Sequence, residues 1–283
     1  MRWRTLGIRC GLVATMACAA GSEDAVEDMV CEGYQVAAIK SLTFARSEGG
    51  VSLGFDLDDE VSTTSDSTCG GADVVDPNGV AGIDNALGAV LPLLDGTEAV
   101  ALEPLIAQFI AEGELLLLVE VAGHEGGDET CPSVAVLRGG GNPLVGADAT
   151  ILGGQTFELD PDSEQAAPVT ATVTSDGAVL ASGLEVEMPV QIFSADLDLS
   201  ILNATTHLEP TEDGGFSGVL AGGVPYQPLL DGLLNAAIDQ SVKTLLQAVL
   251  PSVADLAPDE NGDCTQLSAV IEIEAVPGFL YEP

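Results

Sequence analysis

Short runs of apolar residues, separated by turns rich in glycine and aspartate, recur along this chain and constrain its fold more than any other feature. Alternating runs of this length indicate β-strands, and the regular turns between them favour antiparallel neighbours. The sequence therefore predicts a mainly β or α+β fold, built on an antiparallel sheet or a sandwich. The expected strands cover residues 34–44, 51–55, 115–121, 133–137, 155–159, 169–173, 179–184, 185–193, 197–208 and 267–276.

Three segments show a helical period instead, so we expect two or three amphipathic helices packed on the sheet. They cover residues 85–94, 98–112 and 229–250. The last is the longest, and polar residues recur at every turn of it, which argues against a membrane span. We expect Asp84 to cap the first helix and Pro251 to end the last one.

The N-terminus carries three arginines followed by an apolar run, Leu12 to Ala20, that is too short to span a bilayer. This pattern predicts a signal peptide over residues 1–20 and a single secreted β-rich domain over residues 21–283. Two ways of processing compete: cleavage near Ala20, or lipidation of Cys18, which follows Thr15-Met16-Ala17 as in a bacterial lipoprotein box. The expected location is outside the cytoplasm, as an outer-membrane lipoprotein or as a periplasmic or extracellular protein.

Export places the remaining cysteines in an oxidising compartment. Four of them lie beyond the signal, and a zinc site is disfavoured because none forms a Cys-x-x-Cys pair. We expect two disulfides, and the sequence leaves all three connectivities open. The four cysteines are Cys31, Cys69, Cys131 and Cys264.

The chain has 45 acidic and 7 basic residues, a formal net charge of −38. Nucleic acids and anionic lipids would be repelled, so the expected partners are divalent cations and an unidentified protein. A membrane would be reached only through a lipid anchor. A strong negative charge also keeps exported proteins soluble, which is an alternative explanation. Because 46% of the residues are hydrophobic, the chain can still bury a core.

Acidic residues are densest between Phe55 and Asn85, where no lysine or arginine occurs. Carboxylate and amide oxygens along a glycine-bent loop are typical of calcium ligands. The candidate ligands are Asp56, Asp58, Asp76, Asn78 and Asp84. We therefore expect calcium as a possible structural cofactor. The alternative is that residues 76–79 form an ordinary Asp-Pro-Asn-Gly turn and that Asp84 caps a helix.

The segment does not fit an EF-hand, because Val80 and Leu87 stand where oxygen ligands are required. Catalytic patterns also fail. The two histidines, His124 and His207, are far apart in the chain, and Ser217 has Val219 where a nucleophile elbow needs glycine. We therefore expect a non-enzymatic protein. The alternative function is a carrier that binds apolar ligands, such as lipids, between the sheet and the C-terminal helix.

Three stretches within the acidic segment resemble uncharacterised exported or lipoprotein-like proteins of myxobacteria and other proteobacteria. They are Gly54-Phe55-Asp56-Leu57-Asp58, Cys69-Gly70-Gly71-Ala72-Asp73 and the ten residues from Asp76 to Asn85. The resemblance implies a secreted domain and no established activity. The expected function is thus an exported or lipid-anchored structural or interaction protein of the bacterial envelope.

Overall fold

The computed structural model describes residues 34–63, 69, 71–94, 102–123, 132–192 and 195–281, which belong to one compact unit. The helices are α1 (Ala86–Leu94), α2 (Leu102–Glu112), α3 (Tyr226–Asn235) and α4 (Gln240–Val253). The strands are β1 (Tyr34–Phe44), β2 (Val74–Val75), β3 (Ala81–Ile83), β4 (Leu117–Ala122), β5 (Ser133–Gly140), β6 (Gln155–Leu159), β7 (Val169–Val173), β8 (Val179–Ile192), β9 (Ala195–Pro210), β10 (Phe216–Pro225), β11 (Leu256–Pro258) and β12 (Cys264–Leu280).

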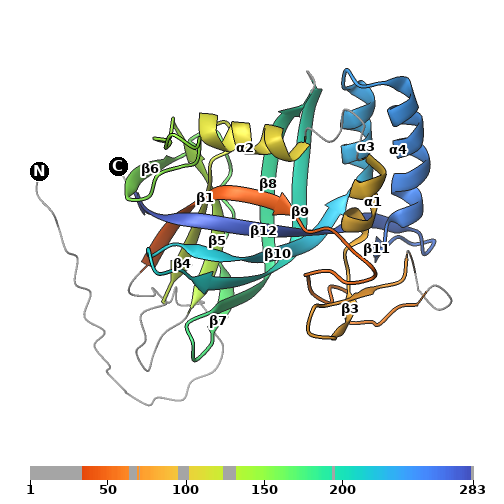
Figure 1. The fold of residues 1–283 in the computed structure, drawn as a ribbon, viewed down its shortest axis with the longest axis horizontal. Coiled ribbons are helices and arrows are strands. Elements are labelled where there is room, and N and C mark those ends of the chain that lie inside the picture. The colour runs from red at the N-terminus through yellow and green to blue at the C-terminus, as the bar shows by residue number, and fades with distance from the viewer. Residues whose placement is uncertain are drawn as a thin grey trace, which may run out of the picture. The chain divides into compact units, whose positions relative to one another are not determined.

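Eight strands pair into a closed antiparallel ring, in the order β1, β4, β5, β7, β8, β9, β10, β12 and back to β1 (Figure 1). The order around the ring is the order along the chain, so this is an up-and-down barrel. The ring closes where β1 meets β12, with Phe44 opposite Ile271 and Val36 opposite Gly278. The predicted mainly β fold with packed helices is confirmed, and its antiparallel sheet is closed into a barrel.

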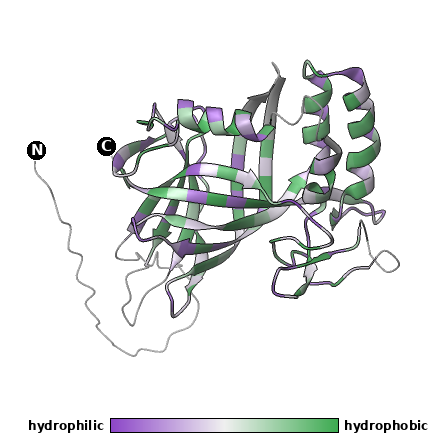
Figure 2. Cartoon of the chain, in the orientation of Figure 1, coloured by the Kyte–Doolittle hydropathy of each residue, from purple (hydrophilic) through white to green (hydrophobic). Residues whose placement is uncertain are grey.

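The core of the barrel follows from the alternation of side chains along the strands. On β12, Glu272 and Glu274 are exposed, whereas Ile271 and Ile273 between them are buried and face the interior. Phe216 of β10 lies opposite Ala275 of β12, on the same face as Ile273, and is fully buried. Figure 2 shows polar and apolar residues mixed along the strands in this way. Apolar side chains from opposite walls therefore fill this part of the interior.

Helix α2 packs against β1 and β8. Strand β4 pairs only with the first half of β1, up to Ala38, and α2 contacts the second half of β1 as well as β8. The carboxylate of Glu103 accepts a 3.1 Å hydrogen bond from the backbone N–H of Phe44, which satisfies a donor on the edge of β1. Ile106 and Ile110 of α2 are buried in the main core.

Helices α1, α3 and α4 lie together where β12 begins (Figure 1). The prediction of one helix over residues 229–250 is wrong, because α3 and α4 are separate. Ala236 ends α3 in an extended conformation, and Asp239 caps α4 by accepting from the backbone N–H of Ser241. Pro251 lies inside α4 and does not end it. No helix among the described residues has the length and apolarity needed to cross a membrane.

Three predicted strands also differ from the structure. Residues 179–192 form one long strand, β8, whose register shifts around Gly183, so the two expected strands are continuous. Residues 51–55 form no strand of their own, although Val51 makes isolated bridges. Strand β10 has no counterpart in the prediction, because five of its ten residues are glycine, serine or proline and hide its alternation.

Candidate functional site

The acidic segment begins with a loop that covers the outer face of the barrel. Leu53, Phe55 and Leu57 pack against a small apolar cluster that contains Val270 of β12. Because alternate residues of an extended segment point to opposite sides, Asp56 and Asp58 are left on the exposed side. Gly54 allows the close approach, since a Cβ there would lie 2.9 Å from a methyl group of Val270.

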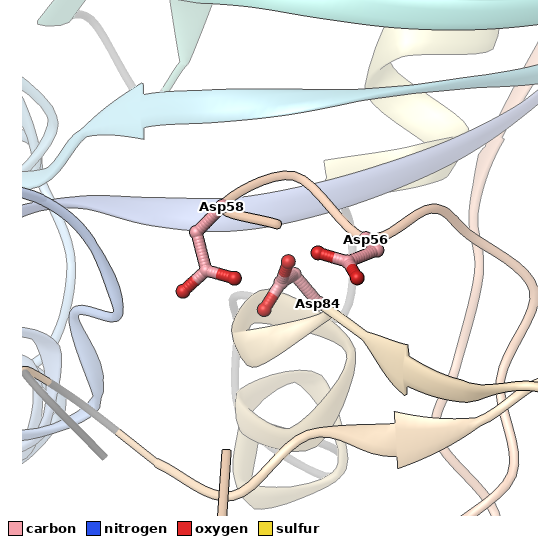
Figure 3. A group of neighbouring side chains, drawn as sticks. All are labelled: Asp56, Asp58 and Asp84. Atoms are coloured by element: carbon pink, nitrogen blue, oxygen red, sulfur yellow. The ribbon is translucent and has the colours of Figure 1, made fainter. Parts of the chain in front are cut away.

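Three aspartates of this segment converge on one point. Oxygen atoms of Asp56, Asp58 and Asp84 all lie within 4.8 Å of one another, and we call these three residues the acidic triad. Figure 3 shows their carboxylates pointing toward one another, two from the loop and Asp84 from the junction between β3 and α1. Asp56 and Asp58 are exposed and Asp84 is buried, so the triad opens to solvent on one side.

Asp84 joins the two parts of the acidic segment. Its carboxylate accepts a 2.7 Å hydrogen bond from the backbone N–H of Leu57, and its own N–H donates to the carbonyl of Phe55. Burial raises the pKa of Asp84 to about 8, although the Leu57 hydrogen bond lowers it, and the negative charges of Asp58 and Asp255 raise it further. Asp84 is therefore largely protonated at neutral pH unless a cation binds beside it.

Two more aspartates lie close to the triad. Asp73 accepts a 2.5 Å hydrogen bond from the N–H of Ser62 and shares a hydrogen bond with the side chain of Asp84. Burial raises the pKa of the Asp73 carboxyl, and the charges of Asp58 and Asp56 add to this. Burial likewise raises the pKa of Asp255 to about 6. Five carboxyl groups thus influence one another in this region.

Asp255 links three elements through Ser268. Its carboxylate accepts from the backbone N–H of Ser268 at 2.7 Å and from the Ser268 hydroxyl at 2.5 Å. The Ser268 oxygen in turn accepts a 2.7 Å hydrogen bond from the N–H of Ala86, the first residue of α1. Ser268 is fully buried, so this chain of hydrogen bonds fixes α1 to β12 from within.

The cap of α1 is Asn85 and not Asp84, which corrects the expected N-cap. The Asn85 side-chain oxygen accepts a 2.9 Å hydrogen bond from the N–H of Gly88, and its amide group donates to Ser52. Asn85 therefore satisfies an orphan donor of the helix, as an N-cap does. The carboxylate of Asp84 is left to face Leu57, Asp56 and Asp58.

Asp76 and Asn78, the other two predicted ligands, form a turn of their own between β2 and β3. The Asp76 carboxylate accepts hydrogen bonds from the backbone N–H groups of Asn78, at 2.8 Å, and of Val80, at 2.7 Å. These hydrogen bonds, that of the Val80 N–H first, lower the pKa of Asp76. Asp76 is not part of the triad, and the carboxylate is committed to the turn.

The same turn occurs a second time, between β11 and β12. Asp259 accepts from the backbone N–H groups of Asn261 and Asp263, and the Asn261 amide also donates to it. Both turns read Asp-x-Asn-Gly, and an aspartate that accepts from the residue two positions later is a common turn device. The Asp-Pro-Asn-Gly sequence at residues 76–79 is thus accounted for by the turn.

The basic residues of the described chain are engaged elsewhere. Lys40 pairs with Glu274 at 3.1 Å and Arg46 with Glu103 at 3.5 Å. The two others donate to backbone carbonyls, Arg138 to that of Glu114 and Lys243 to that of Leu234. The strongest charges acting on Asp84 are consequently negative, and either protons or an added cation must offset them.

A disulfide between Cys69 and Cys264 joins the acidic segment to the start of β12, with 5.4 Å between the two Cα atoms. This is one of the pairings that the sequence left open. The other cysteines, Cys10, Cys18, Cys31 and Cys131, lie outside the described residues, as do His124 and the predicted signal peptide.

Sequence reasoning missed Asp73 and Asp255 as neighbours of the triad. Asp73 lies in the same acidic segment, so its position there was the available signal. Asp255 lies far along the chain, between α4 and β11, and nothing in its local sequence sets it apart from other aspartates. Only the packing of α1 and β12 brings it close.

Comparison with protein-family models, curated proteins and solved structures gave no match.

Proposed function

We propose that this is an exported or lipid-anchored, non-enzymatic structural or interaction protein, and that its acidic triad holds a structural calcium ion. The observation that carries the proposal is the convergence of Asp56, Asp58 and Asp84 to within 4.8 Å at a solvent-open position. Hard oxygen ligands that include more than one carboxylate suit calcium, and water molecules would complete a shell of six to eight oxygens.

The ion would act as a clamp. Asp56 and Asp58 belong to the loop over the barrel, whereas Asp84 precedes α1, so a bound cation would join the two segments and offset the repulsion between their carboxylates. Asp73 and Asp255 add further negative charge nearby, which raises the benefit of a cation. Sites of this kind outside the cell bind calcium with dissociation constants of about 10⁻⁴ to 10⁻³ M.

Thermal melting in calcium and in chelator tests the proposal, with sodium chloride at equal ionic strength to account for general screening of the net charge of −38. We expect calcium to raise the melting temperature of the wild type. Asp58→Asn should remove this shift. Asp76→Asn is the matched control, because Asp76 lies in the same segment but outside the triad, and it should keep the shift. Equal midpoints in calcium and in sodium chloride would overturn the proposal.

A carrier of apolar ligands is the second candidate, and the closed barrel is the observation that favours it. An eight-stranded antiparallel barrel is wide enough either for a core of side chains or for one small ligand. It ranks second because Phe216, Leu208 and Leu184, which the register places inside, are fully buried. Native mass spectrometry before and after chelation separates the two. A bound lipid mass that remains after chelation supports the carrier, and a calcium mass that chelation removes supports the clamp.

A further inference from the structure

Exposed apolar side chains gather around the end of β12. Phe279 of this strand and Tyr281, which directly follows it, are 63% and 52% exposed, and Leu144, in the neighbouring hairpin, is 67% exposed. Single exposed apolar residues are normal, but a group that includes aromatic rings marks an interaction surface. We call this group the β12-end patch; it consists of Tyr34, Leu144, Val145, Leu152, Phe279 and Tyr281.

The segments that carry the patch lie side by side. On one side of β12, β1 pairs with it, with Val36 opposite Gly278, which places Tyr34 just beyond. On the other side, β6 pairs in parallel with Phe279 opposite Thr156. The hairpin of residues 144–152 precedes β6 directly, and the backbone N–H of Leu152 donates to the carbonyl of Leu144.

The position of Tyr34 indicates what the patch faces. The predicted lipid attachment point, Cys18, lies sixteen residues before Tyr34, a span of about 55 Å at full extension. A lipid anchor at Cys18 would therefore keep the start of β1 within about 55 Å of the membrane surface, so this end of the barrel is within reach of it. Tyrosine is also enriched where a protein surface meets lipid headgroups, because its ring is apolar and its hydroxyl is polar. Two of the three tyrosines of the chain, Tyr34 and Tyr281, belong to the patch.

We propose that the β12-end patch rests on the surface of a zwitterionic phospholipid membrane. This inference builds on the lipid-anchored form of the proposed function. Anionic lipids are excluded as the favoured surface, since the net charge of −38 would be repelled by them. A second, weak contact beside an acyl chain strengthens anchoring, because the anchor keeps the patch at high effective concentration near the bilayer.

Sedimentation with phosphatidylcholine vesicles tests the patch without the anchor, using the chain from residue 21, the form that cleavage of the predicted signal leaves. We expect this protein to partition onto the vesicles and Phe279→Ser with Tyr281→Ser to lower the partition coefficient about tenfold. Val80→Ser is the matched control, because Val80 is 59% exposed outside the patch, and it should partition as the wild type does. Unchanged melting temperatures would show that all variants fold.

Two results would overturn the proposal: no partition of the chain from residue 21, or equal partition of the double variant and the wild type. A concentration-dependent dimer that the double variant abolishes would also overturn it, because the patch would then bind a second copy of the chain. The mass of the full protein isolated from the envelope reports lipidation of Cys18 separately. Failure of the anchor and failure of the patch are thus distinguishable.

Discussion

The backbone N–H of Leu57 donates a 2.7 Å hydrogen bond to the carboxylate of Asp84, which lies 27 residues further along the chain. This bond fixes the loop that covers the barrel to the start of α1. It also brings a buried carboxyl group beside Asp56 and Asp58, where a negative charge is unfavourable without a counter-ion.

Two substitutions at Asp84 should separate the role of its carboxylate as a hydrogen-bond acceptor from the effect of its charge. Asp84→Ala leaves the Leu57 N–H without a partner, so we expect a loss of about 1–3 kcal/mol in the free energy of unfolding. Asp84→Asn keeps an oxygen acceptor and removes the charge, so it should be clearly more stable than Asp84→Ala in the absence of calcium. Urea denaturation measures both, and equal losses for the two variants would contradict the assigned role.

Stability without calcium should decrease as the pH rises. The folded-state pKa values of Asp255, about 6, and Asp84, about 8, lie above the ordinary 3.8. At a pH between the ordinary pKa and these raised values, the folded protein therefore binds more protons than the unfolded chain. This stabilisation is fully present below about pH 4 and is lost as the pH passes first through 6 and then through 8. We expect the free energy of unfolding to fall by about 1–3 kcal/mol between about pH 5 and about pH 9.

Two controls make the pH dependence specific. Asp84→Asn should lose the upper part of the decline, because the group that titrates near pH 8 is gone. Saturating calcium should also flatten the curve, since the cation favours the ionised carboxylates that high pH produces. If the curve of Asp84→Asn has the same slope as that of the wild type, the decline comes from the overall charge and not from Asp84.

Ser268→Ala tests the hydrogen-bond chain between Asp255 and α1. The substitution removes the acceptor of the Ala86 N–H and one donor to Asp255 at a fully buried position, so we expect a loss of about 1–3 kcal/mol. Ser252→Ala is the control, because its exposed hydroxyl bonds only the Val249 carbonyl within α4. If the two variants have the same denaturation midpoint, the hydrogen bonds from Asp255 through Ser268 to Ala86 contribute nothing to stability.

Gly54→Ala should destabilise the loop over the barrel. A Cβ at residue 54 would lie 2.8 Å from a methyl group of Ile83 and 2.9 Å from one of Val270, and the backbone has a φ of +147°. Gly183→Ala measures the cost of positive φ alone, because no atom lies within 4 Å of its added Cβ. We expect Gly54→Ala to cost about 1–3 kcal/mol more than Gly183→Ala, and equal thermal shifts would rule out the close packing.

Peptide mapping without reduction should find Cys69 joined to Cys264. If the two other mature cysteines also pair, the second disulfide joins Cys31 to Cys131. Both precede strands that flank β4, since Tyr34 and Ser133 are each paired with Ala122 from opposite sides. Free thiols at residues 31 and 131 would contradict the expected two disulfides.

The sequence predicts the strands well where alternation is regular, as in β6 and β7, and less well where other forces decide. The apolar positions of α3 and α4 continue one helical period, so their separation at residues 236–239 leaves no apolar break to detect. Barrel closure depends on the pairing of β1 with β12, a contact between opposite ends of the chain that no local pattern encodes.

The candidate site shows the same limit. Residues 56 and 58 were found because they are acidic neighbours in sequence, and Asp84 because it ends a glycine-bent loop. Asp76 and Asn78 have the same ligand chemistry, yet a local turn uses their polar groups first. Composition therefore identifies the region, and hydrogen-bond competition decides which of its carboxylates remain available.

The pairing of β12 with both β1 and β10 has a consequence for the biogenesis of the protein. Until the last strand is delivered, β1 lacks one neighbour and β10 another, so the barrel wall cannot be completed. Contacts of such long sequence separation form slowly. In the exported protein that we propose, this delay would keep the chain unfolded while it passes through a translocation channel. Folding would finish only after the whole polypeptide has crossed.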